Sequence, residues 1–176
     1  MKRVFFLNVL VIALFSFRTA TSIYSISVQN INNASISLNV YQSKNIIIAV
    51  FNPASPNTVF LKALDSLAIQ NTNVKIIAIP AKELGAGSTS ALATLAGTFS
   101  SGLMVTKPMN VRKNAGANQH ALFKWLTNYS ENGHFDVDVS EAEQVFVVNA
   151  SGNLYAVLQQ SNTEAIRQIV NQPVSN

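Results

Sequence analysis

The sequence contains no cysteine, and this absence limits its possible chemistry more than any other feature. Without cysteine the chain can form no disulfide and can supply no thiol or thiolate for nucleophilic or redox chemistry. It also has no cysteine that could carry a lipid. A chain of 176 residues without such crosslinks must be held together by its hydrophobic core alone.

Charged residues are also scarce. Only 11% of the residues are charged and 48% are hydrophobic, which is too apolar for a disordered chain and sufficient for one domain with a real core. The formal net charge is +4, but without Lys2, Arg3 and Arg18 nine basic and eight acidic residues remain, which leaves +1. Because no basic patch results, we expect no binding to nucleic acid or to an anionic membrane.

The N-terminus has the three parts of a secretory signal. Residues 1–3 supply positive charge, residues 4–17 form an apolar run, and residues 20–22 offer small side chains for cleavage. The apolar run is shorter than the ~20 residues of a membrane-spanning helix, which favours a cleaved signal over an uncleaved anchor. We therefore expect a signal peptide over residues 1–22, a mature domain over residues 23–176, a secreted or periplasmic location, and no membrane attachment after cleavage.

The hydrophobic pattern after the signal predicts one α/β domain. Residues 45–51 form a nearly unbroken β-branched and apolar run, typical of a central strand buried on both faces. Ser55 and Pro56 then predict the cap and the first residue of a helix over residues 56–70. The other predicted elements are a hairpin at 23–40, strands at 74–80, 144–149 and 154–158, helices at 88–99 and 120–126, an irregular connection at 105–118, and a last helix after a capping box at 161–164.

The loop after the predicted central strand, residues 52–58, reads N-P-A-S-P-N-T. It resembles, without a gap, the N-V-A-S-x-C-G loop of the glutathione peroxidases. Other segments resemble motifs of that family in the same order: I-Y-S-I-S-V at residues 23–28, V-T-K-P-M at 105–109 and H-A-L-F-K-W-L at 120–126. The resemblance spans residues 23–170 and implies a thioredoxin-like fold, in which a central mixed β-sheet is flanked by helices and preceded by a β-hairpin.

The same resemblance implies where the functional groups of the family would lie, and this chain has replaced them. Asn57 takes the place of the peroxidatic cysteine or selenocysteine, and Ala81 that of a second cysteine. Glu83 takes the place of the catalytic Gln, whereas Glu141 and Ala142 take those of a Trp and an Asn. A carboxamide cannot ionise to a nucleophile or be oxidised to a sulfenic acid. The resemblance therefore implies a divergent member without thiol peroxidase activity.

Three hypotheses on function remain open. The first is a pseudoenzyme that binds an unknown small molecule or protein partner, with Ser55, Asn57, Lys82 and Glu83 as candidate ligand-binding residues at the carboxyl ends of the strands. The second is an enzyme of the peroxidase family in the oxidative stress response, with a non-thiol or residual activity. The third is a purely structural or assembly protein. No cofactor is expected in any of them.

An acidic loop near the C-terminal third is a weak candidate for a metal site. His134, Asp136 and Asp138, with Glu141 and Glu143, could ligate a divalent ion, although a solvated acidic loop has the same composition. Asp136 and Asp138 begin like a calcium loop, but Glu141 stands where such a loop turns on Gly. We therefore predict no metal site.

Two further features are interpreted as structural. Trp125 is the only tryptophan, and its spacing from Leu122 and Leu126 places it in the core. The run Gly85-Ala86-Gly87 is expected to be a turn, since no Lys-Ser or Lys-Thr pair follows it to make a phosphate-binding loop.

Overall fold

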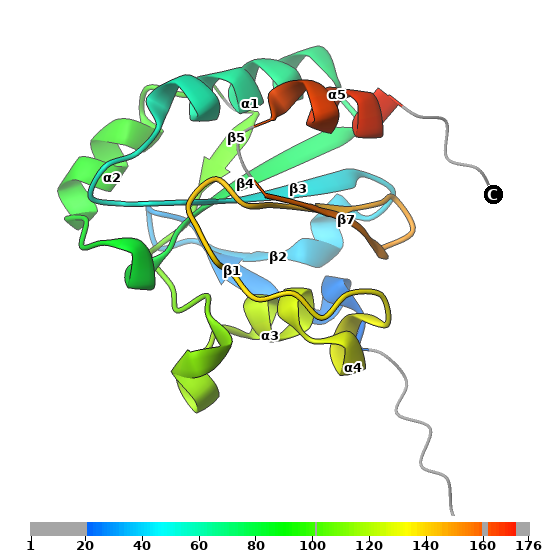
Figure 1. Ribbon diagram of the computed structural model, residues 1–176. Helices are drawn as coiled ribbons and strands as arrows, with labels where there is room; N and C mark the ends of the chain where they lie inside the picture. The colour runs from blue at the N-terminus through cyan, green and yellow to red at the C-terminus, as the bar shows by residue number, and fades with distance from the viewer. Residues whose placement is uncertain (1–20, 101, 160–161, 172–176) are drawn as a thin grey trace, which may run out of the picture.

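The computed structural model describes residues 21–100, 102–159 and 162–171. Its centre is a five-stranded mixed sheet in the order β5-β4-β3-β6-β7, accompanied by a separate hairpin, β1-β2. Helices lie on both faces of the five-stranded sheet (Figure 1). Residues 1–20, which carry nearly all of the expected signal peptide, lie outside the described part, so the signal stays a prediction.

The middle strand of the sheet is β3 (Asn45–Phe51), with the bounds that the apolar run predicted. It pairs in parallel with β4 (Val74–Pro80) and antiparallel with β6 (Val145–Val148). The edge strands are β5 (Leu103–Val105), parallel to β4, and β7 (Leu154–Leu158), which forms a hairpin with β6. Because β3 and β4 are parallel, their carboxyl ends meet at one edge of the sheet.

Two cores lie on opposite faces of the sheet, because alternate residues of each strand point in opposite directions. Ile47 belongs to the core beneath α1 (Thr58–Gln70) and α5 (Thr163–Asn171), which lie together above the sheet in Figure 1. Ile48 belongs to the second core, which α3 (Ala121–Thr127) and the hairpin cover. Every residue of β3 after its first is at most 1% exposed. This burial confirms the two-sided strand expected from the sequence.

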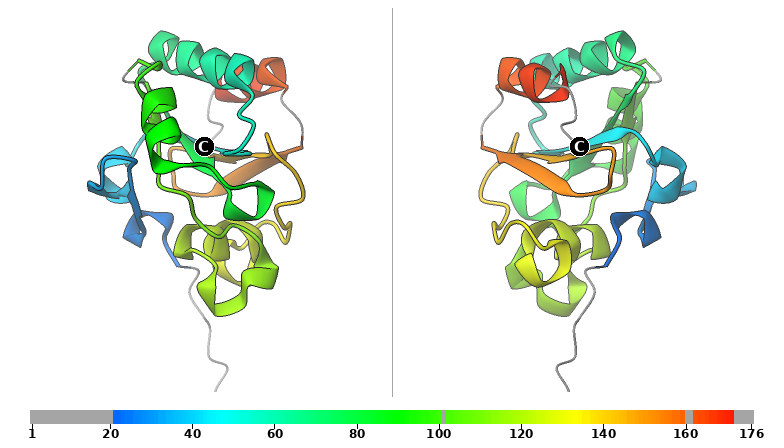
Figure 2. Two further views of the ribbon diagram at one scale, coloured as in Figure 1. Left: turned by 90° about the vertical axis from the view of Figure 1, so that its left-hand side faces the viewer. Right: turned by 90° about the vertical axis from the view of Figure 1, so that its right-hand side faces the viewer.

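The N-terminal hairpin is confirmed, but its strands are shorter than the alternation suggested. β1 (Ser27–Gln29) pairs antiparallel with β2 (Ser35–Ser37), and short 3-10 helices flank them at Ile23–Ser25 and Leu38–Tyr41. The backbone continues from β1 beside the segment after β5, where Lys107 N–H donates to Gln29 O at 3.0 Å. The hairpin, drawn in blue, stands out at one side of the molecule in Figure 2.

The start of α1 differs from the prediction. The helix begins at Thr58, and its N-cap is Asn57, whose side-chain oxygen accepts the backbone N–H of Phe60 at 3.1 Å. Ser55 and Pro56 precede the helix instead of capping and starting it. Asn and Ser are equally good N-caps, so local preference could not choose between them. The hydrogen bonds that Asn57 forms in the folded chain determine which of the two residues caps α1.

The helix predicted at 88–99 is α2 (Thr89–Ala96). Three short helices were not predicted: α4 (Tyr129–Asn132) and the 3-10 helices at Lys82–Leu84 and Lys113–Asn118, which lie in segments expected to be loops or irregular. Before α5, the side chain of Asn162 accepts the N–H of Ala165 at 3.0 Å. Ser161, predicted as the first residue of a capping box there, lies outside the described residues. Among the helices that the structure describes, none combines the length and the apolar character needed to cross a bilayer.

Candidate functional site

Asn57 lies after the end of β3 and directly before α1. Both the oxygen and the nitrogen of its side-chain amide form hydrogen bonds. Its oxygen accepts the N–H of Phe60, and its nitrogen donates to Oε1 of Glu143 at 2.9 Å. An amide caps with its oxygen and donates with a separate nitrogen atom, whereas the shorter side chain of Ser has one oxygen for both hydrogen bonds. The contact with Glu143 therefore explains why Asn57, and not Ser55, caps the helix.

Glu143 is held in place by the neighbouring strands. Its backbone N–H donates to Val50 O at 2.7 Å, and Val50 N–H donates to Gln144 O at 2.9 Å. The backbone of Glu143 is left-handed, with φ of 68°, a conformation that costs a non-Gly residue of the order of 1 kcal/mol. This turn lies just before β6 and directs the Glu143 side chain to the start of α1. The sequence had suggested Glu143 only as part of the acidic loop.

The loop after β4 lies against the turn that precedes Asn57. A Cβ atom at Gly87 would lie only 2.7 Å from Cβ of Pro53, and one at Gly85 would lie 2.9 Å from Cβ of Ala54. Only glycine permits this approach. The Gly-Ala-Gly run therefore packs against a neighbouring turn, which agrees with the structural role expected from the sequence.

Glu83, expected at the position of the catalytic Gln, accepts hydrogen bonds from backbone N–H groups. Its two carboxylate oxygens accept the N–H of Val111 at 2.8 and 3.1 Å, and Oε1 also accepts the N–H of Arg112 at 3.1 Å. Asn57 and Glu83 thus have no hydrogen-bond partner in common. The Arg112 guanidinium continues the chain of contacts by donating to Val139 O at 3.0 Å and Ser140 O at 2.9 Å. Glu83 therefore fixes the segment that in turn holds the acidic loop.

The other predicted site residues have different surroundings. Ala81 is fully buried, and its N–H donates to Phe51 O at 3.1 Å. Ser55 and Lys82 are exposed. Glu141 is exposed, Ala142 is half-buried, and no hydrogen bond recorded for the described residues joins either to Asn57. Ser55 and Lys82 could contact a ligand directly. Ala81 could not do so without a rearrangement of the core.

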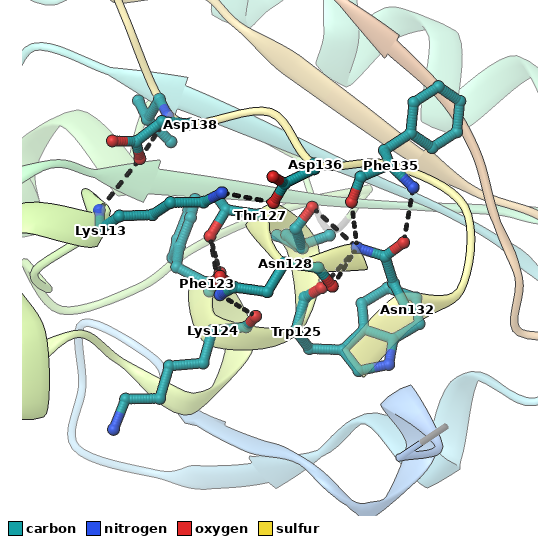
Figure 3. A network of polar contacts seen from close by, with 12 residues as sticks. Lys113, Phe123, Lys124, Trp125, Thr127, Asn128, Asn132, Phe135, Asp136 and Asp138 are labelled. Atoms are coloured by element: carbon teal, nitrogen blue, oxygen red, sulfur yellow. Dashed lines mark hydrogen bonds and ion pairs between the residues drawn. The ribbon is translucent and has the colours of Figure 1, made fainter. Parts of the chain in front are cut away.

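The acidic loop is tied down by hydrogen bonds that use its carboxylates (Figure 3). Asp136 forms an ion pair with Lys113 at 2.5 Å, and the hydrogen bond and charge of that lysine lower the pKa of Asp136. Asp138 accepts the backbone N–H of Lys113 at 3.0 Å. His134 is exposed. Over the described ranges, no group of three or more His, Asp or Glu side chains could hold a metal ion.

Asn132 anchors the start of the same loop from the core side. Its Nδ2 donates to Trp125 O at 2.8 Å, Asn128 O at 2.9 Å and Phe135 O at 2.9 Å, and its oxygen accepts N–H groups from residues 134 and 135 (Figure 3). Trp125 is only 4% exposed and its indole N–H donates to Thr21 O. The core position predicted for Trp125 is confirmed.

Comparisons with known proteins place this architecture among the thioredoxin-like folds. The scan against protein-family models finds no match, and neither does the search of curated proteins. Solved structures do match. The apo form of Trgpx, which is glutathione peroxidase-like, has a TM-score of 0.65 at 20% identity, and the match covers 86% of this chain and 94% of that one.

Two more matches extend the comparison. GPX1 of T. cruzi has a TM-score of 0.64 at 13% identity, covering 85% of this chain and 94% of that one. A secreted disulfide oxidoreductase of Mycobacterium tuberculosis, homologous to DsbE of E. coli, has a TM-score of 0.54 at 10% identity, covering 84% and 95%. At these identities the matches establish the fold, and the predicted thioredoxin-like architecture with its mixed sheet and N-terminal hairpin is confirmed.

Proposed function

We propose that this chain is an exported protein of glutathione peroxidase descent that does not reduce peroxides through a thiol and acts by binding. The observation that carries the proposal is Asn57 at the start of α1. In the resemblance described above this residue replaces the peroxidatic cysteine, and in the fold its amide is fully engaged by Phe60 N–H and by Glu143. The like-folded Trgpx and T. cruzi GPX1 support the descent.

The chemistry of Asn57 favours loss of thiol peroxidase activity. In that reaction a thiolate attacks one oxygen of the peroxide, the O–O bond breaks, and the sulfur becomes a sulfenic acid. The amide nitrogen of Asn57 has no such reactive lone pair, and it donates its hydrogen to Glu143. No cysteine elsewhere in the chain can take over the role.

The contacts of Glu83 favour binding over a retained active site. Its carboxylate is used by the backbone of Val111 and Arg112 and shares no hydrogen-bond partner with Asn57. The exposed side chains near the carboxyl ends of β3 and β4, Ser55 and Lys82, are available to a small molecule or a protein partner. Glu83 and Asn57 would shape that face rather than react.

Peroxide consumption by the mature protein tests the proposal. The wild type, Asn57→Cys and Asn57→Cys with Glu143→Gln are each mixed with hydrogen peroxide and an organic hydroperoxide, with glutathione or thioredoxin as reductant. We expect the wild type to equal a heat-killed control. We expect Asn57→Cys to consume about one equivalent of peroxide without reductant and at least as much with it, because the helix N-terminus favours a thiolate and the reductant can restore it.

The double variant is the matched control for this assay. Removing the charge of Glu143 lowers the pKa of an adjacent thiol, so Asn57→Cys with Glu143→Gln should react faster than Asn57→Cys alone. Asn57→Ser, which differs from Asn57→Cys only by oxygen in place of sulfur, should stay inert. Turnover by the wild type above the heat-killed control would overturn the proposal, and a non-thiol enzyme would take its place.

Export is tested separately by the intact mass of the protein recovered from the periplasm of a bacterial host. We expect a product that has lost about the first 22 residues, as the predicted signal requires. A Val11→Asp variant breaks the apolar run and should stay in the cytoplasm at full mass. The secreted oxidoreductase of the same fold supports an extracytoplasmic role. Wild-type protein found only at full mass inside the cell would refute export.

A further inference from the structure

A cleft of about 370 Å³ lies between the hairpin and the segment that follows β5. It is lined by Ser27, Val28, Gln29, Ser35, Lys107, Pro108, Met109 and His120. None of these residues belongs to the Asn57 and Glu143 site. Backbone contacts join the two sides of the cleft, because Lys107 N–H donates to Gln29 O and Asn30 forms an antiparallel bridge with Thr106.

One wall of the cleft carries three uncharged polar side chains. Ser27 and Gln29 lie two residues apart on β1 and therefore point to the same face of the hairpin. Ser35 is the cross-strand partner of Gln29 on β2 and joins them on that face. All three are exposed, and none of their side chains has a hydrogen-bond partner recorded among the described residues. This wall can donate to a ligand or accept from it.

Among the described residues that line the cleft, Lys107 on the opposite wall carries the only full charge. Lys107 is half-buried, and its ammonium group takes part in neither of the two ion pairs found in the described part of the chain. No hydrogen bond of its side chain is recorded there either, and no Asp or Glu lines the cleft. Lys107 can therefore attract an anion by its charge.

His120, which also lines the cleft, can supply a second donor. Its Nδ1 accepts the backbone N–H of Leu122 at 3.1 Å, so the neutral imidazole carries its proton on Nε2. Burial lowers the pKa of His120, which favours this neutral form. A neutral imidazole with its proton on Nε2 donates a hydrogen bond without adding a second positive charge.

We propose that this cleft binds a small organic monocarboxylate. One ammonium group and one imidazole N–H match the single charge and two oxygens of a carboxylate, and the hydroxyl and amide groups of the hairpin can complete its hydrogen bonds. Of the apolar residues in the lining, half-buried Pro108 can contact a short aliphatic chain, whereas Val28 and Met109 are buried in the core. A phosphate dianion would be left with one uncompensated charge.

A titration of the ¹⁵N-labelled mature protein with butyrate, followed by NMR, tests this site. We expect saturable shifts in the backbone amides of Gln29 and Lys107 with a Kd of the order of millimolar, as for one partly solvated ion pair with a few hydrogen bonds. Butyramide, which has the same shape without the charge, should bind at least tenfold more weakly. Absence of saturable shifts with butyrate, or equal binding of butyramide, would overturn the proposal.

Variants of Lys107 complete the test. Lys107→Met and Lys107→Gln should each weaken butyrate binding at least tenfold, because they keep most of the length of the side chain but not its charge. Lys62→Met removes an exposed lysine of α1 and should bind as the wild type does. Unchanged affinity in the Lys107 variants would also overturn the proposal. The peroxide assay does not involve this cleft, so the two proposals can fail independently.

Discussion

The amide of Asn57 donates a hydrogen bond of 2.9 Å to the carboxylate of Glu143, a residue 86 positions later in the chain. The same amide caps α1, so a single side chain joins the start of that helix to the turn before β6. A cysteine at position 57 could do neither job equally well, because a thiol is a weak donor and a weak acceptor. Asn57 therefore has a clear structural role.

Loss of the Asn57 amide should destabilise the fold. Asn57→Ala removes an N-cap, which typically contributes about 1 kcal/mol, and leaves Glu143 without its hydrogen bond. We expect the free energy of unfolding to fall by about 1 to 2 kcal/mol in urea denaturation followed by the fluorescence of Trp125. A change below about 0.3 kcal/mol would show that neither contact matters to stability.

The effect of Asn57→Asp should depend on pH. Asp is as good a cap as Asn, but its carboxylate would face that of Glu143 and repel it at neutral pH. We expect a loss of stability at pH 7 that shrinks as the pH falls and one carboxylate becomes protonated. In Asn57→Asp with Glu143→Gln the loss at pH 7 should disappear. A pH-independent loss in the single variant would contradict the charge explanation.

Glu83 is expected to affect stability rather than catalysis. Glu83→Ala leaves the N–H groups of Val111 and Arg112 without their acceptor and should cost about 1 to 3 kcal/mol. Glu83→Gln keeps one acceptor oxygen and should cost less. Amide hydrogen exchange at Val111 and Arg112 should speed up in both variants. Unchanged exchange at these two amides would mean that the carboxylate does not hold them.

The close approach at Gly87 gives a steric prediction. A methyl group there would meet Pro53 at 2.7 Å, so Gly87→Ala should destabilise the protein by about 1 to 3 kcal/mol. Gly97, with a right-handed backbone and no contact closer than 3.4 Å, is the matched control. Gly97→Ala should change the free energy of unfolding by less than about 0.5 kcal/mol. Equal effects in thermal unfolding would refute the steric explanation.

Lowering the pH should destabilise the N-terminus of α3, because its N-cap residue is His120. Burial lowers the pKa of His120 in the folded chain, so the unfolded chain gains the proton first as the pH falls below about 6.5. Protonation also turns Nδ1 from an acceptor into a donor and breaks its bond with Leu122 N–H. Stability from this residue is therefore complete above about pH 6.5 and is lost below it.

Denaturation curves between about pH 5 and 8 measure this effect. His120→Asn can still accept the Leu122 N–H but does not titrate, so it should lose part of the decline in stability seen for the wild type. His134 is exposed and serves as the control, since His134→Asn should keep the wild-type decline. Parallel curves for the wild type and His120→Asn would contradict the assignment.

Much of the fold followed from local patterns. The bounds of β3 and β4 were predicted to the residue, because a strand covered on both faces needs a largely apolar run. Polar residues flank β3 at Lys44 and Asn52, and Pro80 ends β4. The hairpin strands were overestimated, since alternation continues into residues that the structure places in 3-10 helices. The alternation of apolar and polar residues indicates which side chains are buried, but it does not distinguish a strand from a short 3-10 helix that buries the same side chains.

The candidate site followed from the sequence only in part. The resemblance directed attention to Asn57 and Glu83, but it gave no sign that Glu143 would reach Asn57 or that Glu83 would hold Val111. The left-handed backbone of Glu143 is what turns its side chain toward α1. Nothing in the neighbouring residues specifies that conformation, because it follows from the pairing of β3 with the segment before β6.

The sequence by itself determined that this protein has no thiol, no disulfide and a core built on one doubly buried strand, because those properties follow from residue types and their order. Only the tertiary structure decided that Asn57 caps α1, that Glu83 binds backbone, and that Lys107 and His120 share a cleft with the hairpin. These relationships join residues that are distant along the chain. The packing of strands and loops determines which residues meet, and local sequence patterns do not contain this information.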